Sequence, residues 1–106
     1  MRIAFRMKVN AGHEAAYVDR HNPIWPELEE TLVAHGVESY SIFLDRASGD
    51  LFAYAEFQDS HRWQAIAQID VCRRWWSHMA PLMPTNADGS PVSEDLEEVF
   101  HIEAAV

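Results

Sequence analysis

The order in which two hydrophobic periodicities follow one another constrains the fold of this chain more than any other feature. Apolar and polar residues alternate over 3–9, a pattern typical of a strand with one buried face. Residues 37–45 and 51–57 are rich in β-branched and aromatic side chains and are separated by a short polar turn, which predicts a hairpin. Residues 95–102 repeat the strand pattern and predict a fourth strand.

Two helical regions lie between these strands, and the first is interrupted. Residues 13–20 have helical character, but Asn22-Pro23 ends it, because a residue before proline is driven out of the helical conformation. We expect the break near His21. Asn22 is expected to cap, and Pro23 to open, a second helical segment that runs to His35.

The second helical region is also expected to be kinked. Helical spacing resumes at Trp63 after the cap-like Asp59, and Asp70 is a candidate cap for a further segment. Three prolines then argue against regular structure over 80–93, which predicts an ordered loop or lid.

The resulting order of strand, helix, strand, strand, helix and strand predicts an α+β fold, a ferredoxin-like βαββαβ plait. We expect a single domain over 1–106, with a mobile tail at 103–106. Both helical regions would cover one face of a four-stranded sheet, and large side chains such as Tyr40 or Phe43 would make the other face apolar. Pairing of two such faces predicts a homodimer in the form of an α+β barrel.

Composition limits the kinds of partner. The formal net charge of −9, with no basic stripe, argues against nucleic-acid binding, which relies on neutralising phosphates. No run approaches the ~20 apolar residues of a membrane span, and the N-terminus lacks a signal-peptide pattern. Cys72 is the only cysteine, which agrees with a reducing compartment. We therefore expect a cytoplasmic protein with a small neutral ligand.

Five residues are candidates for a site. Tyr17 and His21 are four apart, hence on one helical face, and histidine gives and accepts protons near neutral pH. Trp75 and Trp76 cannot both face the core, because neighbouring helical residues diverge by about 100°. The second tryptophan is equally explained by a stacked sugar, by packing or by a dimer contact. Tyr40 offers a hydroxyl, although a half-buried strand tyrosine and a capping His21 are the ordinary interpretations.

The remaining reactive groups fit structural roles. Asp70 is interpreted as a helix cap and not a base, and Cys72 as a small packed residue and not a nucleophile. The six histidines show no metal-ligand spacing, so no metal is expected. A glycine-rich phosphate loop and a serine nucleophile elbow are both missing from the sequence.

Two strings in the chain closely resemble the L-rhamnose mutarotase family. The first is HNPIWPEL at 21–28, preceded by Tyr17, and the second is DVCRRWW at 70–76. The resemblance continues through three shorter strings at 83–84, 90–91 and 98–100. It covers nearly the whole chain at matching spacing.

The resemblance implies a homodimeric barrel that interconverts the α and β anomers of L-rhamnose without a cofactor. It implies that His21 is the proton donor. It also implies that four aromatic residues hold the sugar, namely Tyr17, Tyr40, Trp75 and Trp76.

Three points stay open at this stage. The group that removes the anomeric proton is Tyr17, Asp70 or a bound water. Arg6, which brings a charge into the first strand, and the tail beyond Ile102 depart from the family pattern outside both motifs. The alternatives to a mutarotase are a haem-degrading or quinol monooxygenase of the same dimeric fold and a non-enzymatic sugar-binding dimer.

Overall fold

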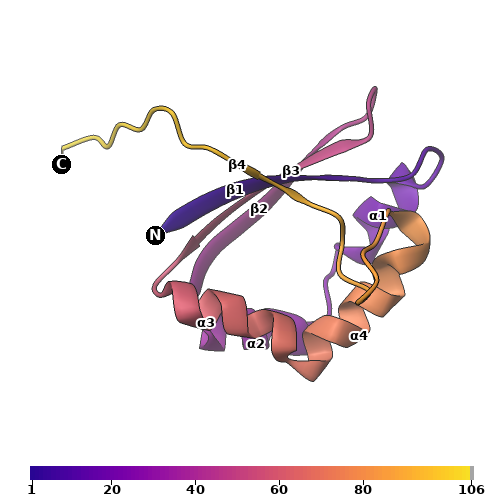
Figure 1. The fold of residues 1–106 in the computed structure, drawn as a ribbon, viewed down its shortest axis with the longest axis horizontal. Coiled ribbons are helices and arrows are strands. Elements are labelled where there is room, and N and C mark those ends of the chain that lie inside the picture. Colours follow the sequence, from indigo (N-terminus) through magenta and orange to yellow (C-terminus); the bar gives the residue numbers. More distant parts are fainter. Residues whose placement is uncertain (106) are drawn as a thin grey trace.

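The computed structural model describes residues 1–105 and confirms the βαββαβ order. The four strands form one antiparallel sheet in the order β2-β3-β1-β4, and all helices lie on one of its faces (Figure 1). No helix among these residues is long and apolar enough to cross a membrane. The elements are β1 (Arg2–Lys8), α1 (Glu14–Arg20), α2 (Pro26–Ala34), β2 (Val37–Asp45), β3 (Asp50–Phe57), α3 (Ser60–Ala65), η1 (Ile66–Gln68), α4 (Asp70–Met79), η2 (Ala80–Leu82) and β4 (Glu94–Leu96).

The strand register separates a buried from an uncovered sheet face. Met7 of β1 is paired with Leu51 of β3, and both side chains are buried beneath the helices. Tyr40 of β2 is paired with Ala55, which has no exposed surface, so Tyr40 lies on the helix-covered face. Phe43 lies on the opposite, uncovered face and is 63% exposed. The expectation that Tyr40 belongs to the uncovered face was therefore wrong, because strand residues three apart point to opposite faces.

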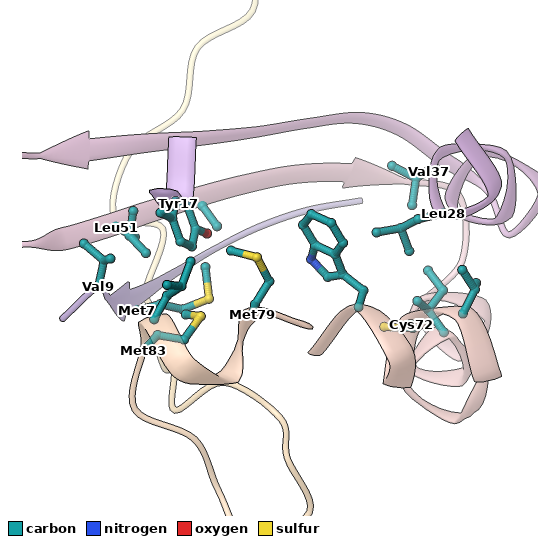
Figure 2. Packing of buried hydrophobic residues seen from close by; sticks show 14 residues of the cluster. Met7, Val9, Tyr17, Leu28, Val37, Leu51, Cys72, Met79 and Met83 are labelled. Atoms are coloured by element: carbon teal, nitrogen blue, oxygen red, sulfur yellow. The ribbon is translucent and has the colours of Figure 1, made fainter. Parts of the chain in front are cut away.

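The core fills the space between the sheet and the helices. Figure 2 shows Met7, Met79 and Met83 gathered between the strands and the C-terminal end of α4. Tyr17 joins them from α1 and is only 5% exposed. The flexible thioether side chain of methionine adapts to irregular gaps, so these three residues can fill the space around the Tyr17 ring.

The first helical region breaks where expected but is capped differently. The chain leaves α1 at His21, and α2 begins only at Pro26, with Trp25 in extended conformation as its N-cap. A residue before proline favours the extended region, and proline suits the first helical position, which explains this start. Asn22 does not cap α2, since its side-chain amide donates to the Val18 carbonyl at 2.8 Å and closes the end of α1. The Asn22-Pro23 peptide bond is cis.

The second helical region is kinked, as predicted. The Asp59 carboxylate caps α3 by accepting the His61 and Arg62 amides at 2.7 and 3.3 Å. The η1 turn then leads into α4, whose N-cap is Ile69. The expectation that Asp70 caps α4 was wrong, because Asp70 is already helical and its carboxylate binds Arg74 four residues on, at 2.7 Å.

The C-terminal part departs most from expectation. Residues 80–93 form η2 and a short Thr85–Pro91 bridge, while β4 ends at Leu96 instead of near residue 102. Its register covers only Ala4–Arg6, so the following segment leaves the sheet and runs away from the body (Figure 1). The predicted mobility of 103–106 stays a prediction, and residue 106 lies outside the described residues.

Candidate active site

Tyr17 and His21 meet at the C-terminal end of α1. Their ring centroids are 4.5 Å apart, and the His21 Nδ1 atom lies 2.8 Å from the Tyr17 backbone oxygen. A carbonyl oxygen only accepts hydrogen bonds, so Nδ1 carries the hydrogen and donates it. The other ring nitrogen, Nε2, is therefore left with a free lone pair in the neutral ring.

The surroundings of His21 favour that neutral ring. Burial lowers the pKa of His21 below its ordinary value of 6.5, and the hydrogen bond to the Tyr17 carbonyl opposes this shift only in part. Near neutral pH the side chain is thus ready to accept a proton at Nε2. Burial also raises the pKa of the Tyr17 phenol, which remains protonated and is a hydrogen-bond donor.

Trp75 forms the next wall of this cluster. The side chain lies on the buried face of α4 and is 8% exposed. Its ring meets His21 edge to face, with centroids 5.1 Å apart and planes at 87°. The structure thus brings together three of the five candidates, Tyr17, His21 and Trp75, from two separate helices.

Two residues that the sequence analysis missed complete the aromatic cluster. Trp25, the N-cap of α2, packs edge to face on Trp75 at 5.1 Å, and His78 lies 5.2 Å from Trp25 and 5.7 Å from Trp75. His78 follows Trp75 by three residues, a helical-neighbour spacing that was available in the sequence. Trp25 is on another segment, so no local spacing indicated it.

Tyr40 and Trp76 stand apart from these rings. Within residues 1–105 neither makes a ring contact with His21; Tyr40 instead packs near Phe5 and Trp63, at 6.4 and 5.8 Å. Burial raises the pKa of the Tyr40 phenol, and the nearby Tyr17 and Cys72 groups add to the rise. Tyr40 is 37% exposed as a whole and lies on the helix-covered face of the sheet, the side on which Tyr17 also packs.

Trp76 turns away from Trp75 by about one helical step of 100°. It is partly buried against the core and follows Cys72 by one turn. Burial raises the pKa of Cys72 to about 11, so the thiol stays protonated and unreactive at neutral pH. This agrees with the interpretation of Cys72 as a packed residue.

Polar contacts at the surface tie the helices of the cluster together. Arg20, which precedes His21, donates to the His78 backbone oxygen near the end of α4. Arg74 donates to Glu27 of α2 at 2.9 Å and to Asp70 within α4. Such exposed pairs add little to stability, because water and salt screen them, so their role here is to orient α1 and α2 on α4.

The βαββαβ order, with all helices on one face of a four-stranded antiparallel sheet, places the chain among proteins of the ferredoxin-like α+β fold. A dimeric ferredoxin-like protein from an uncultured marine organism has a TM-score of 0.65 with this chain, covering 99% of it and 97% of that protein, at 12% identity. At that identity the likeness shows the fold alone.

The chain belongs to the L-rhamnose mutarotase family, whose model matches residues 2–102. The L-rhamnose mutarotase of Opitutus terrae is 56% identical over 103 residues, 97% of this chain and 99% of that one. The crystal structure of an L-rhamnose mutarotase from Formosa agariphila superposes with a TM-score of 0.88 at 43% identity, covering 97% and 99% of the two chains. The protein is thus an enzyme of the isomerase class, as expected from the sequence.

Proposed function

We propose that the protein interconverts the α and β anomers of L-rhamnopyranose by opening and reclosing the ring, with His21 as the group that moves the protons. The observation that carries this proposal is the His21 ring, neutral, hydrogen-bonded through Nδ1 and free at Nε2, beside two buried aromatic residues. Membership of the family supports the choice of sugar.

The neutral ring suggests how the protons move. Nε2 of His21 accepts the proton of the anomeric hydroxyl, and the imidazolium then gives a proton to the ring oxygen as the C1–O5 bond breaks. The products are an open aldehyde and neutral His21, so the proton count balances. Rotation about C1–C2 presents the other face of the aldehyde, and the reverse steps close the second anomer. The ring opening is redox-neutral, and only protons pass between the protein and the sugar, so this chemistry needs no cofactor.

This mechanism also narrows the candidates for the base. Asp70 is bound to Arg74 with its side chain 83% exposed, and the Tyr17 phenol stays protonated. We therefore propose that His21 performs both transfers. The protonated Tyr17 and Tyr40 hydroxyls donate hydrogen bonds to sugar oxygens, while Trp75 or Trp76 stacks on the apolar face of the pyranose.

Saturation-transfer NMR on equilibrated L-rhamnose tests the function directly. Exchange between the two anomer signals is expected to be fast with the protein and slow without it. Exchange at the spontaneous rate, together with retained sugar binding, would instead support the non-enzymatic sugar-binding dimer. A Soret shift on adding haemin would support the haem-degrading alternative.

The pH dependence of exchange reports the protonation state of His21. Because burial lowers its pKa below 6.5, the active neutral ring is expected to persist at pH 6.5 and to be lost only as the pH falls further. The measurement is the enzyme-catalysed exchange rate between pH 5 and 8, corrected for the spontaneous rate. A rate that rises on acidification would contradict the proposal that the resting ring is neutral.

The proposed stacking role of Trp76 has its own kinetic test. Trp76→Ala is expected to raise KM by roughly tenfold and to change kcat less, because stacking contributes to both ground-state and transition-state binding. Trp76→Phe retains an aromatic face and should keep KM within a few-fold of the wild type. A loss confined to kcat would remove Trp76 from the binding role.

We also propose that two chains pair through their uncovered sheet faces. That face carries exposed apolar side chains on three strands, Phe43, Phe52 and Leu96, at 63%, 37% and 38% exposure. Arg6 lies on the same face and is held by Glu94 of β4 at 2.6 Å, so its charge has a partner beside this patch. Sedimentation equilibrium tests the pairing, and a monomer at micromolar concentration would contradict it.

We further propose a cytoplasmic location. The single, unpaired Cys72 supports it, because such a thiol fits a reducing compartment.

A further inference from the structure

Trp25 is the residue through which α2 reaches the aromatic cluster. It is the N-cap of α2 and is partly buried against the core. Its indole ring meets the Trp75 ring edge to face, with centroids 5.1 Å apart and planes at 82°. Its other ring contact is with His78, so Trp25 is connected to His21 through Trp75.

The Trp75 ring lies at nearly right angles to two neighbours. Its plane makes an angle of 87° with the His21 ring and 82° with the Trp25 ring, and both centroids are 5.1 Å away. An edge-to-face pair depends on orientation, because the positive edge of one ring is directed at the negative face of the other. Rotation of the Trp75 ring would therefore weaken both contacts, and a ring held by Trp25 is also held against His21.

His78 closes the cluster around Trp25. Its imidazole ring lies 5.2 Å from the Trp25 ring and 5.7 Å from the Trp75 ring. The His78 backbone oxygen accepts a hydrogen bond from Arg20, the residue before His21. One residue of α4 thus contacts Trp25 with its side chain and holds the end of α1 with its main chain.

An ion pair holds the start of α2 against α4 beside these rings. Nη2 of Arg74 donates to both carboxylate oxygens of Glu27, at 2.9 and 3.1 Å. Glu27 follows Trp25 by two residues, and Arg74 precedes Trp75 by one. The backbone segments that carry the two tryptophans are therefore tied together, which limits how far Trp25 can move away from Trp75.

We propose that Trp25 is a positioning residue for mutarotation, which fixes the Trp75 ring and through it the His21 imidazole. This role rests on the function proposed above, because it serves the proton transfers assigned to His21. Proton transfer requires the donor and acceptor to be within hydrogen-bond reach, and a small misplacement of a catalytic group can cost about 10²-fold in rate. Trp25 acts from behind Trp75 and needs no contact with the sugar.

The cover that these rings provide also controls the proton affinity of His21. Burial is the larger cause of its lowered pKa, and the hydrogen bond to the Tyr17 carbonyl opposes it. No charged neighbour is a cause of this shift among the described residues 1–105. The titratable and charged groups in or beside the cluster are Tyr17 and Arg20 of α1, Glu27 of α2, and Arg74 and His78 of α4. A looser cover would admit water to His21, and its pKa would rise toward 6.5.

Histidine NMR tests the positioning role without reference to activity. Protein with ¹⁵N-labelled histidine rings is titrated between pH 5 and 8, and the spectrum of His21→Ala identifies the His21 signals. Trp25→Ala is expected to raise the pKa of His21 toward its ordinary value of 6.5. Trp25→Phe keeps a ring against Trp75 and should retain the wild-type midpoint. An unchanged midpoint in Trp25→Ala would overturn the positioning role.

Anomer exchange provides the second readout. Trp25→Ala is expected to lower kcat at pH 7 by roughly tenfold and to raise KM by about threefold or less, because it disturbs the proton transfer more than the binding of the sugar. The fall in rate at acid pH should begin at a higher pH than in the wild type, since the neutral ring is lost earlier. A raised KM with unchanged kcat and unchanged His21 pKa would overturn the proposal, because it would place Trp25 in direct contact with the sugar.

Trp63 provides a matched control. It is also a partly buried tryptophan at the edge of the core, but its ring contacts are with Phe57 and Tyr40, at 4.9 and 5.8 Å. Trp63→Ala is expected to leave the pKa of His21 unchanged. An equal shift in Trp63→Ala and Trp25→Ala would overturn the proposal, because it would reflect a general loosening of the core.

The same samples separate this role from the function on which it rests. Anomer exchange by the wild type together with an unchanged His21 midpoint in Trp25→Ala would overturn the positioning role alone. Exchange at the spontaneous rate in the wild type would overturn the proposed function, whatever the midpoint in Trp25→Ala.

Discussion

Replacing His21 with alanine is expected to lower the catalysed rate of anomer exchange by ~10²–10⁴-fold, the usual contribution of one acid-base group. The loss should fall on kcat, because His21 is proposed to transfer protons in the transition state. The aromatic residues are proposed to bind the sugar, so KM should change less. Saturation-transfer NMR on L-rhamnose, compared among wild type, variant and no protein, measures it. Nearly full activity in His21→Ala would remove His21 from the mechanism.

His35 provides a matched control for this experiment. Its Nδ1 atom lies 2.9 Å from the Thr31 backbone oxygen, four residues earlier, the same local arrangement as His21 and Tyr17. His35 follows α2 and is not part of the aromatic cluster. His35→Ala removes an equivalent helix-end contact and should leave the exchange rate unchanged, so a loss seen only in His21→Ala reflects chemistry at the site.

Trp75→Ala is expected to lower the free energy of unfolding by about 3–5 kcal/mol, the usual cost of truncating a buried tryptophan. Trp75 is 8% exposed and is in ring contact with three side chains, those of His21, Trp25 and His78, so its loss opens a cavity between α1, α2 and α4. Urea unfolding at one fixed chain concentration measures the change, because the stability of a dimer depends on concentration.

Trp75→Phe is the companion variant. It retains an aromatic ring in the same space and should lose less than half as much stability, while His21 keeps an edge-to-face neighbour. If Trp75→Ala unfolds at nearly the wild-type urea concentration, Trp75 is not a structural part of the cluster, and its role would be confined to the ligand.

Local features of the fold were predictable because they depend on residues close in the sequence. Alternation over 3–9 and the hairpin of 37–57 follow from the period of two in a strand, and Asp59 caps α3 by reaching the amides two and three residues ahead. A polar side chain that could cap the following helix can instead bind another nearby group, and which of the two it does depends on the residues around it. Asn22 closed α1 and Asp70 bound Arg74, so neither capped the helix that followed.

In the candidate site, too, contacts between residues close in the sequence were predictable, and contacts between distant segments were not. Four-residue spacing on one helix was enough to place Tyr17 beside His21, and the resemblance to the family implied roles for all five candidates, although Tyr40 lies outside the matching strings. The sequence could not place Trp75 against His21 or add Trp25, because these contacts join α1, α2 and α4 across long stretches of chain. Nor could it give the lowered pKa of His21, which depends on burial by residues distant in sequence.

The order of residues was sufficient to indicate where strands and helices form and which chemical groups the protein has available, although not where β4 ends or α2 begins. Tertiary structure alone decided that β4 stops at Leu96, because a strand continues only where a neighbouring edge accepts its hydrogen bonds. It alone decided that Tyr40 lies under the helices while Phe43 stays uncovered, because the face a strand buries depends on where the helices pack. Periodicity is a property of neighbouring residues, whereas burial and contact are properties of the assembled chain.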